Sequence, residues 1–336
     1  MSQKLPLNEF SLIERFFANH SQRNDLVLGI GDDAAIVEVP KDHQLVISSD
    51  TLVEGVHFLP NIPPRALGHK ALAVNLSDLA AMGAEPRWAT LSISLPSLDE
   101  QWLAEFSAGL FELAEFFNVA LIGGDTTRGP LSITITIHGV IPKDKALLRS
   151  SAMPGDWLYV TGSIGGSNLA LQSLLDEDFA HEYQQHFNKD QQQAHLDKHY
   201  FPQPRVLAGY GLRGVANAVI DISDGLYGDL RHILKASDCD AKLWLEKLPV
   251  VEGLEQFLGR EQALKMALCG GEDYELCFTV PEANKGSLDI ALSYSGVNHQ
   301  CVGQLSRGDG QIELLEHGQA KAIELPISWD HFTTSA

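Results

Sequence analysis

Long apolar runs are missing from this sequence. No stretch of about eighteen apolar residues, the shortest that commonly spans a membrane as a helix, occurs anywhere in the chain. The first residues form an amphipathic pattern and carry no apolar core with a small-residue cleavage site behind it. We therefore expect a cytoplasmic protein with no membrane partner.

Basic side chains are also scarce. The chain has 24 Lys and Arg residues against 44 Asp and Glu residues, which gives a net charge of -20 at pH 7. Such a charge repels nucleic acid and anionic membrane surfaces, and no run of Lys or Arg reverses it locally. We therefore expect no nucleic-acid partner.

Sulfur ligand sets and the common catalytic motifs are missing as well. The four cysteines lie in the C-terminal third without a C-x-x-C pair or an adjacent histidine: Cys239, Cys269, Cys277 and Cys301. This pattern is typical of buried thiols rather than of a sulfur-ligated metal. The sequence also lacks G-x-x-x-x-G-K-[ST], the protein-kinase catalytic loop, H-E-x-x-H and G-x-S-x-G, which excludes the ordinary nucleotide-binding and hydrolase signatures.

The composition is that of a globular protein with room for two domains. The chain has 336 residues, of which 44% are hydrophobic and 20% are charged. Helical patterns run from about residue 64 to 82 and from about 99 to 117, among strand-like runs. Pro154 and Gly155 interrupt the pattern, and a second series of strand and helix signals follows. These signals predict an α/β protein with domains at residues 1–149 and 150–336.

Two further segments carry information about surfaces. From residue 131 to 141, isoleucines alternate with Thr134, Thr136 and His138, which predicts a strand with one buried face and one polar or partner-facing face. One interpretation is that this second face forms a homodimer through the sheet. Residues 176–200 are rich in Gln, His, Glu and Asp with little periodicity, so we expect a solvated helix or loop insertion without a chemical role.

Acidic residues are concentrated in motifs of small residues. Seven aspartates occur in five such motifs: Asp32 and Asp33 in GIGDDA, Asp50 in SSDT, Asp78 in NLSDLAAMGA, Asp125 in GGDTTRGP, and Asp221 and Asp224 in DISDGL. Several motifs follow an apolar run that is typical of a buried strand, LVLGI among them, so the acids are expected to gather at strand ends. Like charges about 4 Å apart repel by roughly 1 kcal/mol in water and about 4 kcal/mol at an intermediate dielectric, so such a cluster requires raised pKa values or bound cations. Oxygen ligands without a Cys or His cluster favour Mg²⁺ bridging to a phosphorylated ligand, and a nucleotide is the ligand we expect.

Each motif also has a simpler interpretation. GIGDDA matches the dinucleotide fingerprint G-x-G-x-x-A, but its two carboxylates would repel a pyrophosphate, and a strand-like run follows it. A metal held by Asp32 or Asp33 and a plain surface turn both remain open. Asp78 either reaches solvent or points into a site, since an unpaired carboxylate on its apolar helix is costly.

The motifs of the second half allow alternatives too. The acids of DISDGL could cap a helix as well as bind a metal. Glu272 and Asp273 in GGEDYEL are interpreted from their residue types as solvated turn residues. Arg128 and Arg149 could meet phosphate oxygens, although a single arginine is more often a solvated surface group.

Six motifs in order carry a resemblance to a known family: GIGDDAA, ISSDTLVEGVHF, KALAVNLSDLAAMGA, LIGGDTTRGP, DISDGL and GGEDYEL. Together they resemble the thiamine-monophosphate kinase family, which belongs to the superfamily of aminoimidazole ribonucleotide synthetase. The resemblance implies a two-domain α/β (α+β) fold whose N-terminal domain has a mixed sheet that forms a dimer interface. It also implies ATP-dependent phosphorylation of thiamine monophosphate to thiamine diphosphate with several Mg²⁺ ions.

The resemblance further implies roles for individual residues. Magnesium ligands are expected at Asp33, Ser48, Ser49, Asp50, Asp78, Asp125, Asp221 and Asp224. Contacts to ATP are expected from Gly124, Asp125, Arg149 and Ser223, and contacts to thiamine monophosphate from His57, Glu272 and Trp329. No catalytic base is expected, because a phosphate monoester with a second pKa of about 6 is already an anionic nucleophile at neutral pH.

Two other functions fit the same acidic motifs. One is another ATP-dependent activity of the superfamily, such as aminoimidazole ribonucleotide synthesis. The other is a regulatory module that holds magnesium nucleotide without turnover. Product formation from thiamine monophosphate and ATP distinguishes the kinase from both.

Overall fold

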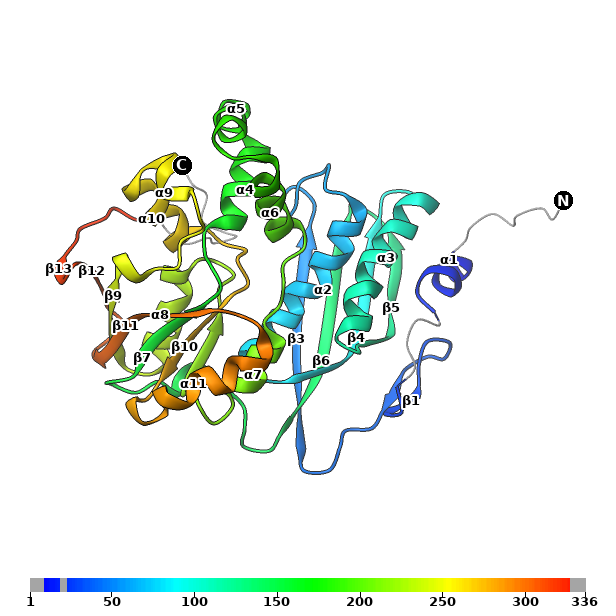
Figure 1. The fold of residues 1–336 in the computed structure, drawn as a ribbon. Helices are drawn as coiled ribbons and strands as arrows, with labels where there is room; N and C mark the ends of the chain where they lie inside the picture. The colour runs from blue at the N-terminus through cyan, green and yellow to red at the C-terminus, as the bar shows by residue number, and fades with distance from the viewer. Residues whose placement is uncertain (1–8, 19–22, 327–336) are drawn as a thin grey trace. The chain divides into compact units, whose positions relative to one another are not determined.

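The computed structural model describes residues 9–18 and 23–326 (Figure 1). Its contacts divide the chain into two compact units, one of residues 1–79 and 84–144 and the other of residues 80–83 and 145–336. The predicted domain boundary after residue 149 stays a prediction. Within the part of the chain that the structure describes, no helix has the length and apolar character needed to cross a membrane.

The first unit is built on a mixed four-stranded sheet. Its elements are α1 (Glu9–Phe16), β1 (Leu26–Leu28), β2 (Ile36–Val37), β3 (His43–Val53), α2 (Pro64–Ala81), β4 (Glu85–Leu95), α3 (Glu100–Phe116), β5 (Ala120–Arg128) and β6 (Ser132–Pro142). The strand order is β3-β6-β4-β5. β4 and β5 are parallel, whereas β6 runs antiparallel to β3 and β4.

Helices α2 and α3 lie beside this sheet (Figure 1), at the positions that the helical patterns predict. Asp99 begins α3, since its side chain accepts hydrogen bonds from two backbone N–H groups of the first turn. The two helices touch through glycine, because a Cβ at Gly68 would lie 2.0 Å from the carbonyl oxygen of Phe106. The buried isoleucines of β6 alternate with half-buried Thr134, Thr136 and His138, which confirms the predicted two-faced strand.

The second face of the sheet is covered in part by the β1–β2 hairpin. Trp88, Ala120, Ile122 and Val140 form a buried cluster against Leu26, Ala35 and Val37 of the hairpin. The prediction that LVLGI forms a buried strand is wrong, because β1 is a short hairpin strand with Val27 58% exposed and Leu28 36% exposed. Leu45 and Ile47 of β3 are also exposed, so part of this face has no cover within the described chain.

The second unit contains a mixed sheet of seven strands. Its strands are β7 (Trp157–Thr161), β8 (Ala218–Asp221), β9 (Cys239–Trp244), β10 (Leu276–Val280), β11 (His299–Arg307), β12 (Ile312–Glu316) and β13 (Gln319–Ala320). Its α-helices are α4 (Gly166–Leu175), α5 (Glu177–His186), α6 (Lys189–Tyr200), α7 (Val206–Leu212), α8 (Leu226–Ala236), α9 (Leu254–Leu258), α10 (Arg260–Cys269) and α11 (Lys285–Leu292). The strand order is β13-β12-β9-β11-β7-β10-β8. The main core joins apolar side chains of β7, β8, β9 and β10 to α8 and α10.

The polar segment of residues 176–200 forms helices α5 and α6. Asp176 caps α5, and Asn188 caps α6 in a capping box with Gln191. The expectation of a solvated insertion is wrong for α6, because His195 and His199 are each 4% exposed. The sequence does not reveal this burial, because the buried side chains of α6 are histidines rather than aliphatic residues.

The cysteines are at least partly buried. Cys239 and Cys277 are buried, and Cys269 and Cys301 are half-buried. The prediction of buried thiols is therefore confirmed for the first pair.

Candidate functional site

Three of the predicted ligand residues of the first unit meet between β3 and α2. The hydroxyl of Ser48 donates a hydrogen bond to the half-buried carboxylate of Asp78. The backbone N–H of Asp50 donates to Oδ1 of Asn75 at 3.2 Å. Asn75 is fully buried and its amide nitrogen donates to the carbonyl oxygen of Ala71 at 3.1 Å. Asp78 therefore faces β3, which favours a site over a solvated helix surface.

Asp50 and Asp125 lie inside their strands and not at strand ends, so that expectation is wrong for both. β3 and β5 continue well past the apolar runs that mark them in the sequence, because backbone pairing across the sheet extends through the polar residues. Register places Asp125 on the same face as Ser49 and Thr136, opposite the face that carries Asp50. Asp125 and Ser49 therefore lie on one face of the sheet, and Asp50 lies on the other.

Gly124 is held where no side chain fits. Its φ is +151°, and a Cβ there would lie 1.8 Å from the carbonyl oxygen of Leu91. We expect Gly124→Ala to lower the free energy of unfolding by about 2 kcal/mol or more through backbone strain and a steric clash. Gly123→Ala is the matched control, because the nearest atom to its Cβ would be Thr90 Cγ2 at 4.0 Å. Equal unfolding midpoints for the two variants in urea would contradict this.

The remaining predicted residues of the first unit lie in loops. Asp32 and Asp33 are both exposed, and Oδ1 of Asp32 accepts the backbone N–H of Asp33 at 2.9 Å. His57 is half-buried in the turn after β3, where its Nδ1 accepts the backbone N–H of Val53 at 3.0 Å.

In the second unit, the DISDGL loop joins the end of β8 to the start of α8. Asp221 is the last residue of β8 and is buried. The expected capping role of the two acids is wrong, because the N-cap of α8 is Gly225 and makes no side-chain cap hydrogen bond. Asp229 of α8 instead fixes the loop, since its Oδ2 accepts the backbone N–H groups of Ser223 and Asp224, each at 3.1 Å.

Asp229 is a site residue that the motif analysis does not find. Burial and the nearby charges of Asp221 and Asp224 raise its pKa to about 8. Its only sequence signal is an acidic residue in the first turn of a helix, which is common and carries no chemistry of its own. The raised pKa is the effect expected for a buried carboxyl group with other carboxylates nearby.

The donor set suits a magnesium ion bound with help from phosphate. Among residues 9–18 and 23–326, no three or more His, Cys, Asp or Glu side chains form a ready metal site. Magnesium usually takes one or two carboxylates and completes its shell with water and substrate phosphates. The pair Asp50 and Asp78 in the first unit, and the pair Asp221 and Asp224 in the second, match that requirement.

Glu272 and Asp273 are half-buried, so their interpretation as solvated turn residues is wrong. Glu272 has a φ of +66°, and its backbone N–H donates to the carbonyl oxygen of Ser223 at 2.7 Å. This bond ties the GGEDYEL motif to the DISDGL loop. The carboxylate of Asp273 accepts the backbone N–H of Gly165 at 2.8 Å, and burial raises its pKa to about 7.

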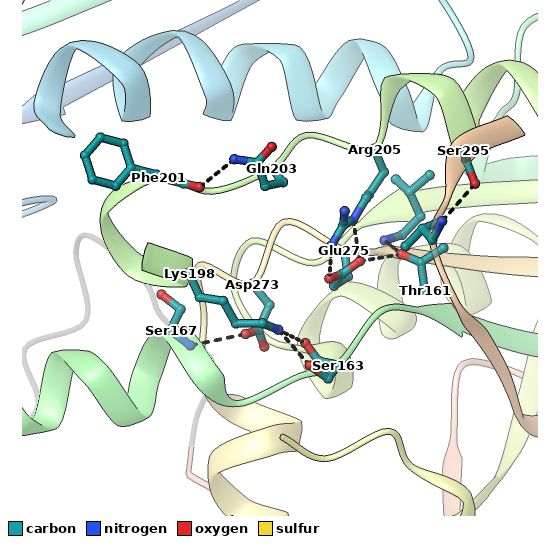
Figure 2. Close-up of polar contacts among 12 residues, drawn as sticks. Thr161, Ser163, Ser167, Lys198, Phe201, Gln203, Arg205, Asp273, Glu275 and Ser295 are labelled. Atoms are coloured by element: carbon teal, nitrogen blue, oxygen red, sulfur yellow. Dashed lines mark hydrogen bonds and ion pairs between the residues drawn. The ribbon is translucent and has the colours of Figure 1, made fainter. Parts of the chain in front are cut away.

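An ion pair between Arg205 and the buried Glu275 also fixes the GGEDYEL motif (Figure 2). Arg205 donates two hydrogen bonds to the carboxylate of Glu275, at 2.7 and 2.6 Å. Glu275 is 1% exposed and also accepts a hydrogen bond from Thr161 Oγ1 at 2.7 Å. The end of the GGEDYEL motif, where β10 begins, is therefore fixed by a bidentate contact between charged groups.

A cavity of about 730 Å³ opens between α4 and α10. Asn168 and Gln172 line it from α4, Met266 and Gly270 line it from α10 and its end, and residues 324–326 close another side. Gly270 is the first residue of the GGEDYEL motif, so this motif lines part of the cavity. Arg149 is exposed in a 3-10 turn (Arg149–Ser151), and Trp329 lies outside the described residues.

Comparisons with known proteins agree across both units. The N-terminal domain of AIR synthase related proteins matches residues 31–141, and the C-terminal domain of the same proteins matches residues 153–313. Thiamine-monophosphate kinase of Escherichia coli (strain K12) is 50% identical over 327 residues, which cover 97% of this chain and 98% of that protein. The protein of the same name from Haemophilus influenzae is 43% identical and covers 98% of this chain and 100% of its own length.

Solved structures show the same similarity. The crystal structure of thiamine-monophosphate kinase from Stenotrophomonas maltophilia K279a has a TM-score of 0.83 and 40% identity, covering 94% of this chain and 98% of its own. The structure of AaThiL complexed with AMPPCP and TMP has a TM-score of 0.74 and 30% identity, covering 90% of this chain and 92% of its own. The likeness therefore spans both units.

Proposed function

The chain belongs to the thiamine-monophosphate kinase family of the AIR synthase related proteins, and we propose that it transfers the terminal phosphoryl group of ATP directly to thiamine monophosphate. The observation that carries this function is 50% identity over 97% of the chain to a protein of that name. A relative of this fold, AaThiL, is complexed with AMPPCP and TMP, which supports ATP as the co-substrate. The two-unit α/β fold with mixed sheets is the architecture that the family resemblance implies.

The residues of the chain act by binding and orientation. The phosphate of thiamine monophosphate is the nucleophile, so no side chain has to remove a proton from it. We assign ATP contacts to Gly124, Asp125, Arg149 and Ser223, and thiamine monophosphate contacts to His57, Glu272 and Trp329. The carboxylate of Glu272 suits the thiazolium cation, and its reach from the GGEDYEL motif is set by the contacts to Ser223 and His199.

The acidic residues of both units hold magnesium in this proposal. The ligands are Asp33, Ser48, Ser49, Asp50, Asp78, Asp125, Asp221 and Asp224. When bound, magnesium offsets the repulsion between the two phosphorylated substrates and stabilises the charge of the transferring group. The carboxylate of Asp78 is oriented by the hydroxyl of Ser48, and the backbone of Asp50 is fixed by its N–H donation to Asn75.

The uncovered part of the first sheet supports a homodimer. Leu45 and Ile47 are 42% and 56% exposed beside the hydroxyl pair of Ser49 and Thr136, whose oxygens lie 2.9 Å apart. Apolar and hydroxyl side chains on one sheet face suit a second copy of the same face. Sedimentation equilibrium is expected to give twice the 36.7 kDa mass of the chain; the mass of a single chain would contradict the dimer.

The kinase assignment has a direct test. Purified protein with ATP, Mg²⁺ and thiamine monophosphate is expected to form thiamine diphosphate and ADP in equal amounts, measured by chromatography. Formylglycinamidine ribonucleotide is the control substrate, because its consumption would favour aminoimidazole ribonucleotide synthesis instead. Nucleotide binding without any thiamine diphosphate would contradict the kinase and favour a non-catalytic module.

A further inference from the structure

We propose that His199, in the last turn of α6, is a positioning residue that holds Glu272 in the orientation needed to bind thiamine monophosphate. The proposal rests on the proposed function, because it takes Glu272 as a substrate contact. It gives a role to the polar segment of residues 176–200, to which the sequence pattern assigns none.

The contact is direct and buried. His199 is 4% exposed, and its Nδ1 lies 3.3 Å from Oε2 of Glu272 and 3.0 Å from Oγ of Ser167. An ionised carboxylate can only accept hydrogen bonds, so Nδ1 must carry a proton to attract Glu272, and the hydroxyl oxygen of Ser167 is then a second acceptor for that proton. Burial strengthens such a bond, because water does not compete for the donor.

Glu272 needs this kind of support. Its φ of +66° is a left-handed backbone conformation that a residue with a Cβ rarely adopts. Strain of this kind persists where the surroundings fix the residue and is concentrated at functional sites. The Glu272 side chain keeps 25% of its surface exposed, so part of it is accessible to a ligand.

The end of α6 is itself anchored (Figure 2). Nζ of Lys198 donates to the carbonyl oxygen and the hydroxyl of Ser163, at 2.6 and 2.8 Å. Ser163 opens the loop whose Gly165 N–H is bound by Asp273, the residue after Glu272. Hydrogen bonds therefore connect the loop before α4 to both the end of α6 and the GGEDYEL motif. These contacts fix the position of His199 relative to Glu272.

Steady-state kinetics test the proposal. His199→Ala is expected to raise the KM for thiamine monophosphate at least tenfold and to change the KM for ATP less than twofold. His199→Asn is expected to restore most of the affinity, because its amide nitrogen can occupy the place of Nδ1. His199→Gln is the matched control, since its amide nitrogen reaches the place of Nε2 instead and should not restore it. Equal behaviour of the Asn and Gln variants would overturn the proposal, and this comparison remains decisive if the Ala variant does not fold.

A double-mutant cycle shows whether His199 acts through Glu272. In a Glu272→Gln background, His199→Ala is expected to change the KM for thiamine monophosphate less than twofold further. A full tenfold effect in that background would overturn the positioning role. An inactive wild-type protein would refute the proposed function, whereas an active one with an unchanged KM in His199→Ala would refute this inference alone.

Discussion

Replacing Asp78 by asparagine is expected to lower kcat for thiamine diphosphate formation about a thousandfold, because the loss of one fixed charge at a metal-assisted phosphoryl transfer removes several kcal/mol of transition-state stabilisation. The fold should persist. The amide oxygen of asparagine can still accept the hydroxyl of Ser48 that now bonds to Asp78, and the side-chain volume is unchanged. Initial rates together with the thermal unfolding midpoint measure both parts of this prediction.

Asp144→Asn is the matched control for charge. Asp144 is exposed, lies in the first unit and belongs to none of the acidic motifs. Its φ of 62° is a conformation that asparagine tolerates. The control should keep the wild-type rate within twofold. A wild-type rate in Asp78→Asn would remove Asp78 from the site.

Replacing Arg205 by methionine is expected to lower the free energy of unfolding by about 3–5 kcal/mol, because it leaves the carboxylate of Glu275 buried without its cation. Glu275 is 1% exposed, and the hydroxyl of Thr161 would be one remaining partner. The shift of the unfolding midpoint in urea measures the loss.

An exposed ion pair of the same type serves as the control for Arg205. Arg65 and Glu112 lie 2.8 Å apart with side chains 45% and 64% exposed. Arg65→Met should therefore cost less than about 1 kcal/mol. If both substitutions shift the midpoint equally, burial of the Arg205 pair is not what stabilises this region.

Secondary structure with strong periodicity is predicted well from this sequence. Helices α2 and α3 and strand β6 lie where their patterns place them. Strand β6 has the alternation of buried and half-buried residues that only a strand can satisfy, whereas α2 is a long run of small and apolar residues that is buried on nearly all sides. The lengths of β3 and β5 are not predicted, since partner strands supply the hydrogen bonds that extend them past their apolar cores. Tertiary pairing, rather than local preference, decides where such strands end.

The supporting residues of the site are harder to predict. Asp229, His199 and Arg205 lie in none of the six motifs. Their partners are side chains or backbone groups that come close to them only in the folded chain. Arg205 and Glu275 are 70 residues apart in the sequence, and Asp273 and Gly165 are 108 residues apart. Composition offers no signal for such pairs, so Glu272 and Asp273 look like solvated turn residues until their partners are known.

The central claim is that the acidic motifs bind divalent cations that assist phosphoryl transfer between the two substrates. Electron paramagnetic resonance titration with Mn²⁺, in the presence of AMPPCP and thiamine monophosphate, counts the bound ions directly. We expect more than one tightly bound Mn²⁺ per chain in the wild-type protein and at least one fewer in both Asp78→Asn and Asp224→Asn. Variants that bind as many Mn²⁺ ions as the wild type, with the same affinity, would contradict the claim.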